Sequence, residues 1–238
     1  FSGRADADES AADDDAVTLS QGLNRIAWNA RYAPLFEIPE GIVMWGGSEG
    51  APRVVPGTYQ VRVTVGDWSD TQSFEVRSDP RMETTLAEYR EQLDLAKEVG
   101  LRIADLYAEL LRLREVKSQA AEIGDRLERA GHGDDVARAA TELSERLTAI
   151  EAELTQLEGE GGQDALNFPG RLDNQFVVLY NAVAETDRRP SAGARERFTD
   201  VSPGLAELLE QIEVTLGAEL PRFNELVRSK GVPAIILS

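Results

Sequence analysis

The only histidine of the chain, His132, is the first side chain to consider for catalysis, because an imidazole is the commonest general base near neutral pH. It lies between Gly131 and Gly133. A Ser-His-Asp triad needs an imidazole that a carboxylate and packed surroundings hold in place. A glycine-flanked turn provides neither, so the sequence favours an exposed turn residue over a catalytic base. A histidine-based metal site would need a further histidine, which the sequence lacks.

Acidic pairs and glycine pairs are the next candidates. Glu158 and Glu160 could form a glycosidase pair, which requires two carboxyl groups that face each other across a cleft, but 43 acidic residues produce such pairs without any function. The run at 13–15 is three aspartates, yet no glycine-turned loop with alternating oxygen ligands follows it, as calcium binding would require. The glycine pairs at 46–47 and 161–162 lack the Gly-Lys-Ser/Thr of a phosphate loop. We therefore predict no catalytic, cofactor or metal residues in this chain.

Three tryptophans could form a face on which sugar rings stack: Trp28, Trp45 and Trp68. Aromatic residues on strands more often belong to the core. Trp45 and Trp68 are the better candidates for a ligand face, and the core alternative stays open for both.

Charge is the strongest signal in the composition. The chain of 238 residues has 25 basic and 43 acidic residues and a net charge of −18, which argues against binding to nucleic acid phosphates. Nearly all of the basic residues are arginines, as expected of a GC-rich genome or of a protein adapted to high salt. The absence of cysteine excludes disulfides, Cys-ligated zinc and a thiol nucleophile. No apolar stretch approaches the roughly 20 residues that span a bilayer, so we expect no membrane insertion.

The first third of the sequence predicts an acidic linker and then a small β-domain. Residues 1–20 are rich in Asp and Ala, which is typical of a solvated, disordered linker. Within 21–82, the larger apolar side chains of 25–32 alternate as in a half-buried strand, and 38–45 is a weaker candidate strand.

The clearest β signal is a hairpin. Apolar residues alternate from Tyr59 to Val65, the pair Gly66-Asp67 is a turn signal, and Phe74 and Val76 continue on a returning strand. Three or four strands are too few for a closed sandwich. The helices, a partner, or strands outside this chain therefore have to cover the open sheet.

A helical period begins after residue 82, and we predict a helical domain over 83–238. Thr85 and Glu88 fit a capping box, and the apolar residues that follow predict one helix of about 45 residues, in which Gly100 is a candidate bend. A glycine turn ends it, with Asp134 as the predicted N-cap of a second helix whose apolar residues run to Leu157. Together these segments predict an antiparallel coiled-coil hairpin over 85–158.

Shorter helices are expected over 171–230. One has its apolar face at Leu172, Phe176, Leu179 and Val183, and another is predicted to begin at Ser202, with Pro203 as its first helical residue. The fold class is thus α+β, with a small Ig-like antiparallel β-domain followed by a helical hairpin and bundle. The hairpin either buries its own seam or uses its exposed end to dock a partner or a second copy.

Two stretches resemble a known family. The segment GLNRIAWNARY at 22–32 resembles the "GLNRFxWDLRY" segment of bacterial proteins with sortilin-like (BNR-repeat) β-propellers, which are often labelled glycosyl hydrolases. Residues 56–65, 71–72 and 79–81 resemble the "PGTYTVRLTV", "TQ" and "DPR" of the same region. Later parts of the helical region also resemble that family's C-terminal part. Asn29 stands where the family usually has Asp, at a position expected to be structural.

The resemblance implies an extracellular, periplasmic or cell-envelope location and propellers upstream of this chain. Hydrolase residues of that family would lie in the propeller, and none can be assigned to this chain. The residues at 1–4 resemble the end of a preceding strand, which implies that the chain begins partway through its Ig-like domain. We expect a non-catalytic C-terminal interaction or scaffolding module that binds a protein partner, its own upstream propeller or a second copy. The alternative is an accessory carbohydrate-binding region of a glycoside-hydrolase-like enzyme.

Overall fold

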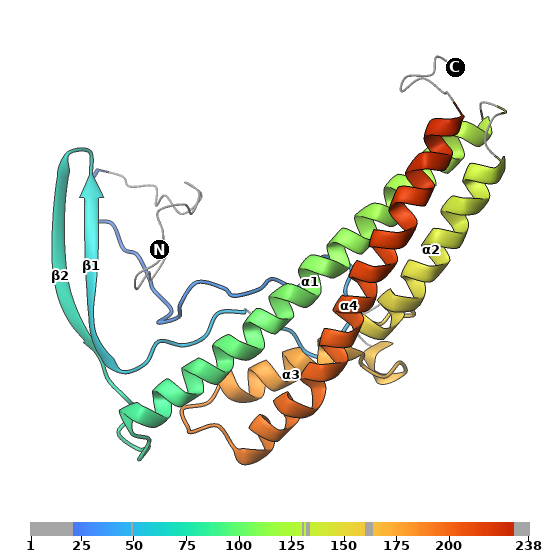
Figure 1. The fold of residues 1–238 in the computed structure, drawn as a ribbon. Helices are drawn as coiled ribbons and strands as arrows, with labels where there is room; N and C mark the ends of the chain where they lie inside the picture. The colour runs from blue at the N-terminus through green and yellow to red at the C-terminus, as the bar shows by residue number, and fades with distance from the viewer. Residues whose placement is uncertain (1–20, 49, 130, 132–133, 160–163, 231–238) are drawn as a thin grey trace.

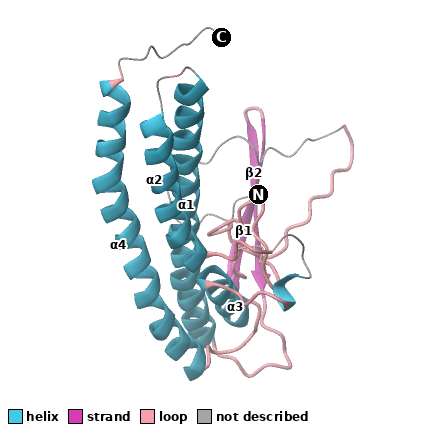
Figure 2. Ribbon diagram, turned by 90° about the vertical axis from the view of Figure 1, so that its right-hand side faces the viewer, coloured by secondary structure: helices cyan, strands magenta, loops and turns pink. Residues whose placement is uncertain are grey.

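The computed structural model describes residues 21–48, 50–129, 131, 134–159 and 164–230. It combines a two-stranded antiparallel sheet with a helical bundle, which confirms the α+β class. Figure 1 shows the β-hairpin standing apart from the helices, and Figure 2 shows the long helices side by side with the short α3 at one end. The predicted linker at 1–20 lies outside the described residues.

The longest element is α1, Leu86–Arg129, which is the single long helix that the sequence predicts. Its N-terminus has the predicted capping box. The Thr85 amide donates to the Glu88 carboxylate at 2.8 Å, and the Glu88 amide donates to the Thr85 hydroxyl at 3.3 Å. The hydrogen bond from the Thr85 backbone is the main cause of the lowered pKa of Glu88. Local sequence therefore fixes where this helix begins.

The second helix, α2 (Asp134–Leu154), packs on α1, and its predicted seam is buried. The buried apolar residues of that seam are Val136, Ala140, Leu143, Leu147, Ile150 and Leu154. Asp134 is the first residue of the helix rather than its predicted N-cap, and Leu157 lies beyond the helix, where it is 39% exposed.

Two further helices complete the bundle. The short α3 (Leu172–Ala184) has the predicted buried face, and α4 (Ala192–Ser229) packs on α3, α2 and α1. The prediction of a helix beginning at Ser202 was wrong. Ser191 caps α4 by accepting a hydrogen bond from the Ala194 amide, and Pro203 lies inside the helix. Because Val201 and Leu205 are both buried, packing on either side of Pro203 holds the helix together despite the missing N–H.

The β-hairpin is the predicted one. Strands β1 (Gly57–Val65) and β2 (Trp68–Val76) pair in a register that joins Val65 to Trp68 across a two-residue turn. Gly66 has a φ of 56°, which is the conformation that a type II′ hairpin turn needs at its first central position.

The other two predicted strands were wrong. In 25–32 only Arg31 makes a β-bridge, with Arg53, because Ala30 has a φ of 56° and the Asn29 side chain accepts the Arg31 amide at 3.2 Å. Residues 38–45 form no strand. Their apolar side chains, Ile38, Ile42 and Met44, pack instead on the helical core.

The loop that contains these residues is clamped onto the helices. The Arg31 guanidinium donates two hydrogen bonds of 2.7 Å to Glu185, just past α3, and a third to the Ala51 carbonyl. The hydrogen bonds from Arg31 are the main cause of the lowered pKa of Glu185. Phe36 is buried between the rings of Tyr107 and Tyr180.

Gly100 is a point of close approach between this loop and α1. A β-carbon at this position would lie 2.6 Å from Leu35 Cδ1, 3.2 Å from Leu35 Cβ and 3.3 Å from the Tyr180 ring. By contrast, Gly217 in α4 has open space around it. The glycine that the sequence offers as a bend therefore admits the loop against the helix.

These two glycines provide a matched test of loop docking. Gly217→Ala should raise the free energy of unfolding by about 0.5–1 kcal/mol, because alanine has the higher helix propensity. Gly100→Ala should lower it by about 1–3 kcal/mol, because Leu35 and Tyr180 must move apart. Urea denaturation of both variants measures the difference, and equal stabilisation by both would show that the loop does not press on α1.

Candidate functional site

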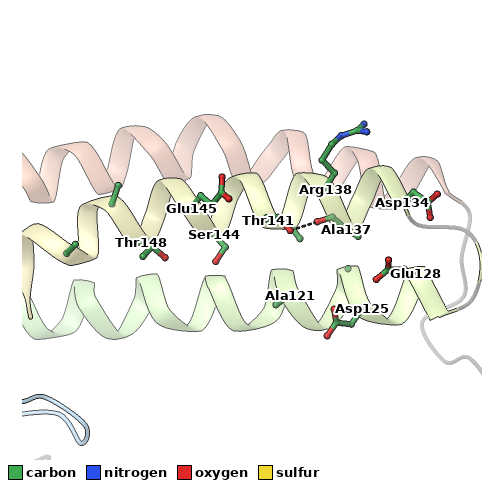
Figure 3. Close-up of a pocket in the computed structure, with 14 residues that line it drawn as sticks. Ala121, Asp125, Glu128, Asp134, Ala137, Arg138, Thr141, Ser144, Glu145 and Thr148 are labelled. Carbon is green, nitrogen blue, oxygen red and sulfur yellow. Dashed lines mark hydrogen bonds between the residues drawn. The ribbon is translucent and has the colours of Figure 1, made fainter. Parts of the chain in front are cut away.

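One candidate site on the helices is a groove between α1 and α2, which we call the hairpin groove (Figure 3). It has a volume of about 820 Å³, and every lining residue comes from α1 or α2. Small side chains form its floor: Ala121, Gly124, Ala137, Ala140, Thr141, Ser144, Thr148, Ala149 and Ala152. Small residues let another backbone approach closely, so the groove has the character of a helix-docking surface.

Acidic side chains surround this floor. Four of the five charged lining residues are acidic, and Arg138 is the exception. The acidic members are Asp125, Glu128, Asp134 and Glu145, and all four are exposed. The rim therefore favours a cationic occupant.

Close packing of the two helices shapes the groove. A β-carbon on Gly124 would lie 3.3 Å from both Ala137 Cα and Ala140 Cβ, so this glycine lets α2 lie directly against α1. Sequence reasoning missed the groove because it followed only the large apolar residues. A second signal was present, since small residues recur at steps of three and four along α2, from Ala137 to Ala152.

A buried ion cluster joins the two helices near the middle of α1. The Glu151 carboxylate accepts hydrogen bonds from Arg114 at 2.6 Å and Lys117 at 2.7 Å, and its side chain is only 5% exposed. Burial acts to raise the pKa of Glu151, but the hydrogen bonds and charges of Lys117 and Arg114 together outweigh it, and the pKa is lowered. This cluster fixes the register between α1 and α2.

The pKa of a second buried carboxylate is shifted in the opposite direction, upward. Asp173 in α3 is buried, and burial raises its pKa although the Thr155 hydroxyl donates to it at 2.7 Å. It joins the end of α2 to the start of α3. Its other carboxylate oxygen accepts the Asn174 amide at 2.6 Å, so both oxygens are engaged in local contacts and we assign it a structural role.

A second groove of about 920 Å³ lies at the base of the β-hairpin. It contains four arginines, Arg31, Arg53, Arg77 and Arg81. Each of them is paired with a nearby carboxylate. Arg77 and Arg81 pair within their own segment, whereas Arg31 and Arg53 pair with carboxylates just past α3, and the positive charge of all four is already compensated.

The two predicted ligand-face tryptophans lie on different elements. The Trp45 carbonyl accepts a hydrogen bond of 3.0 Å from Asn174 of α3, and this tryptophan is 58% exposed. Trp68 begins β2 and is 57% exposed. No ring contact found among the described residues joins the two, so a ligand face would use them separately.

The structure describes only some of the remaining candidate residues from the sequence. His132, Glu160, the aspartate run at 13–15 and the glycine pair at 161–162 lie outside the described residues. Glu158 is exposed, and its amide donates to the Gln156 side chain at 3.0 Å. The Gly47 carbonyl accepts a hydrogen bond of 2.7 Å from Asn181, which places the glycine pair at 46–47 against α3.

In the parts of the chain that the structure describes, no three acidic or histidine side chains converge as a metal site would require. None of the described helices is both long enough and apolar enough to span a bilayer. Comparison of the chain with models of known protein families, with curated proteins and with solved structures finds no match.

The ion cluster of Glu151, Arg114 and Lys117 provides a test of what stabilises the packing of α2 on α1. Glu151→Gln should lower the free energy of unfolding by about 1–3 kcal/mol at pH 7, because two partly buried cations lose their partner. Since the pKa of Glu151 is lowered on folding, this contribution is complete above its ordinary value of 4.5 and is lost as the pH falls through the folded-state value. Denaturation of both proteins between pH 7 and pH 3 measures the difference.

The control is Glu153→Gln, which removes an exposed carboxylate from the same helix. It should change the free energy of unfolding by no more than about 0.5 kcal/mol. A Glu151→Gln effect that is constant across this pH range would contradict the assigned role of the charge.

Proposed function

We propose that this chain is a non-catalytic interaction module that uses the hairpin groove to dock a helix of a partner protein. The observation that carries the proposal is the floor of small side chains between α1 and α2, which no other described element covers. An amphipathic helix laid into a groove is a common mode of protein recognition. Such a partner would add a further helix beside α1, α2 and α4.

The charge of the rim specifies the chemistry of the partner. The acidic residues of the rim would meet Lys or Arg on either side of an apolar seam. A second copy of this chain is the poorer occupant, because each copy has a net charge of −18. The resemblance to the C-terminal part of envelope β-propeller proteins agrees with a scaffolding role outside the cytoplasm, and we include that location in the proposal.

The test uses two synthetic amphipathic helical peptides with the same leucine seam. One has lysine on both sides of the seam and the other has glutamate. The lysine peptide should bind the full chain at physiological salt, as measured by titration calorimetry. The glutamate peptide should bind at least about tenfold more weakly, because like charges face each other across the rim.

Matched variants distinguish the groove from general charge attraction. Ala121→Trp fills the groove and should abolish binding of the lysine peptide. Gln119→Trp places the same bulk on an exposed part of α1 away from the groove and should leave binding unchanged. Equal binding by both variants would contradict the proposal.

A second candidate function is an accessory carbohydrate-binding region. The exposure of Trp45 and Trp68 favours it, since exposed indole rings can stack on sugars. Glycan-array binding that Trp45→Ala or Trp68→Ala removes would support this function. Absence of glycan binding by the full chain would leave the protein-docking proposal as the only candidate.

A further inference from the structure

None of the described helices packs against the β-hairpin. Figure 1 shows both strands, β1 and β2, standing clear of α1. A two-stranded hairpin alone is at best marginally stable in water. Whatever covers it therefore contributes to its order.

One face of this hairpin is apolar. In the observed register, Tyr59 lies opposite Phe74, Val63 opposite Asp70, and Val65 opposite Trp68. Opposite residues of an antiparallel pair share a face, so these six side chains lie on the same side. The other side is polar.

The two ends of the apolar face differ. Away from the turn, the Trp28 ring lies 5.9 Å from Tyr59 and 5.8 Å from Phe74 and covers both. Near the turn, Val63, Val65 and Trp68 are 39%, 52% and 57% exposed. We call these three residues and Asp70 the open patch.

The open patch is too small for a stable face-to-face contact. Its apolar side chains expose on the order of 300 Å², whereas a stable interface buries about 800 Å² on each partner. A strand that pairs with an open edge of the hairpin adds main-chain hydrogen bonds to this apolar contact. The dimensions therefore favour an added strand over a covering surface.

The position and charge of Asp70 indicate which edge of the hairpin is used and what kind of residue the partner places there. It is the only charged residue on the apolar face, it lies on β2, and its carboxylate accepts a hydrogen bond of 3.1 Å from the Gln72 side chain. The corresponding face of a second copy has no basic residue to pair with it. A second copy is also opposed by the net charge of −18.

We propose that the edge of β2 accepts an extended strand of a partner protein that runs antiparallel to it, with an apolar residue opposite Trp68 and a basic residue opposite Asp70. Aromatic pairs with β-branched residues and pairs of opposite charge both stabilise neighbouring strands. This surface is separate from the hairpin groove, so the two proposals can fail independently.

The test uses two blocked nine-residue peptides that alternate valine and threonine. They differ only at the position that faces Asp70, where one has lysine and the other glutamate. In an NMR titration of the full chain at physiological salt, the lysine peptide should shift the amides of β2. It should bind about three- to tenfold more tightly than the glutamate peptide.

Charge-reversal variants identify the pairing. Asp70→Lys should reverse the preference, so that the glutamate peptide binds more tightly. Ser69→Lys places the same charge on the opposite face of β2 and should keep the preference for the lysine peptide, which controls for attraction to the acidic protein as a whole. Because neither strand packs on a helix, both variants should retain the helical circular dichroism of the parent chain.

Four results would overturn the proposal. The first is no shift of the β2 amides by either peptide at millimolar concentration, and the second is an equal reversal of preference by Ser69→Lys. The third is a dimer of the free chain that Val65→Glu dissociates, which would make a second copy the occupant. The fourth is binding that occurs only after residues 1–20 are removed, which would make that segment the occupant.

Discussion

The apolar stripe of α1 has to be buried along all 44 residues of the helix, and most of the structure follows from that requirement. No single neighbour of α1 is long enough to cover it. In the half near Arg129, Gly124 lies against α2, whereas in the half near Leu86, Gly100 lies against α3 and against the loop before β1. This division explains why a loop without regular structure is clamped so tightly by Arg31 and Phe36.

Covering α1 in this way leaves two surfaces without a neighbour among the described residues. The hairpin groove lies on the part of α1 and α2 that neither α3 nor α4 lines, and the open patch lies on strands that reach no helix. Both are defined by side chains that a folded core would normally use: small residues at helical spacing in one, and valine and tryptophan in the other. An interaction module needs surfaces of this kind, and this is the physical basis of both proposals.

Charge distinguishes the core from these surfaces. Inside the bundle, the carboxylate of Glu151 is compensated by Arg114 and Lys117, and the carboxylates of the loop clamp are compensated by arginines. At the groove rim and at Asp70 the negative charge exceeds the positive charge nearby. This excess is the reason that both proposals name a basic partner, and the net charge of the whole chain is the reason that neither names a second copy.

Local signals in the sequence determined α1, α2, α3 and the β-hairpin, because a capping box, an apolar period and a turn at Gly66 act within a few residues. The tertiary structure decided three other features. It turned the alternating segment at 25–32 into a clamp on α3, since Arg31 pairs with a residue 154 positions away. It kept α4 continuous through Pro203, because buried side chains on both sides outweigh one lost hydrogen bond. It also assembled the hairpin groove, because the small residues of α2 form a surface only when α2 lies directly against Gly124 of α1.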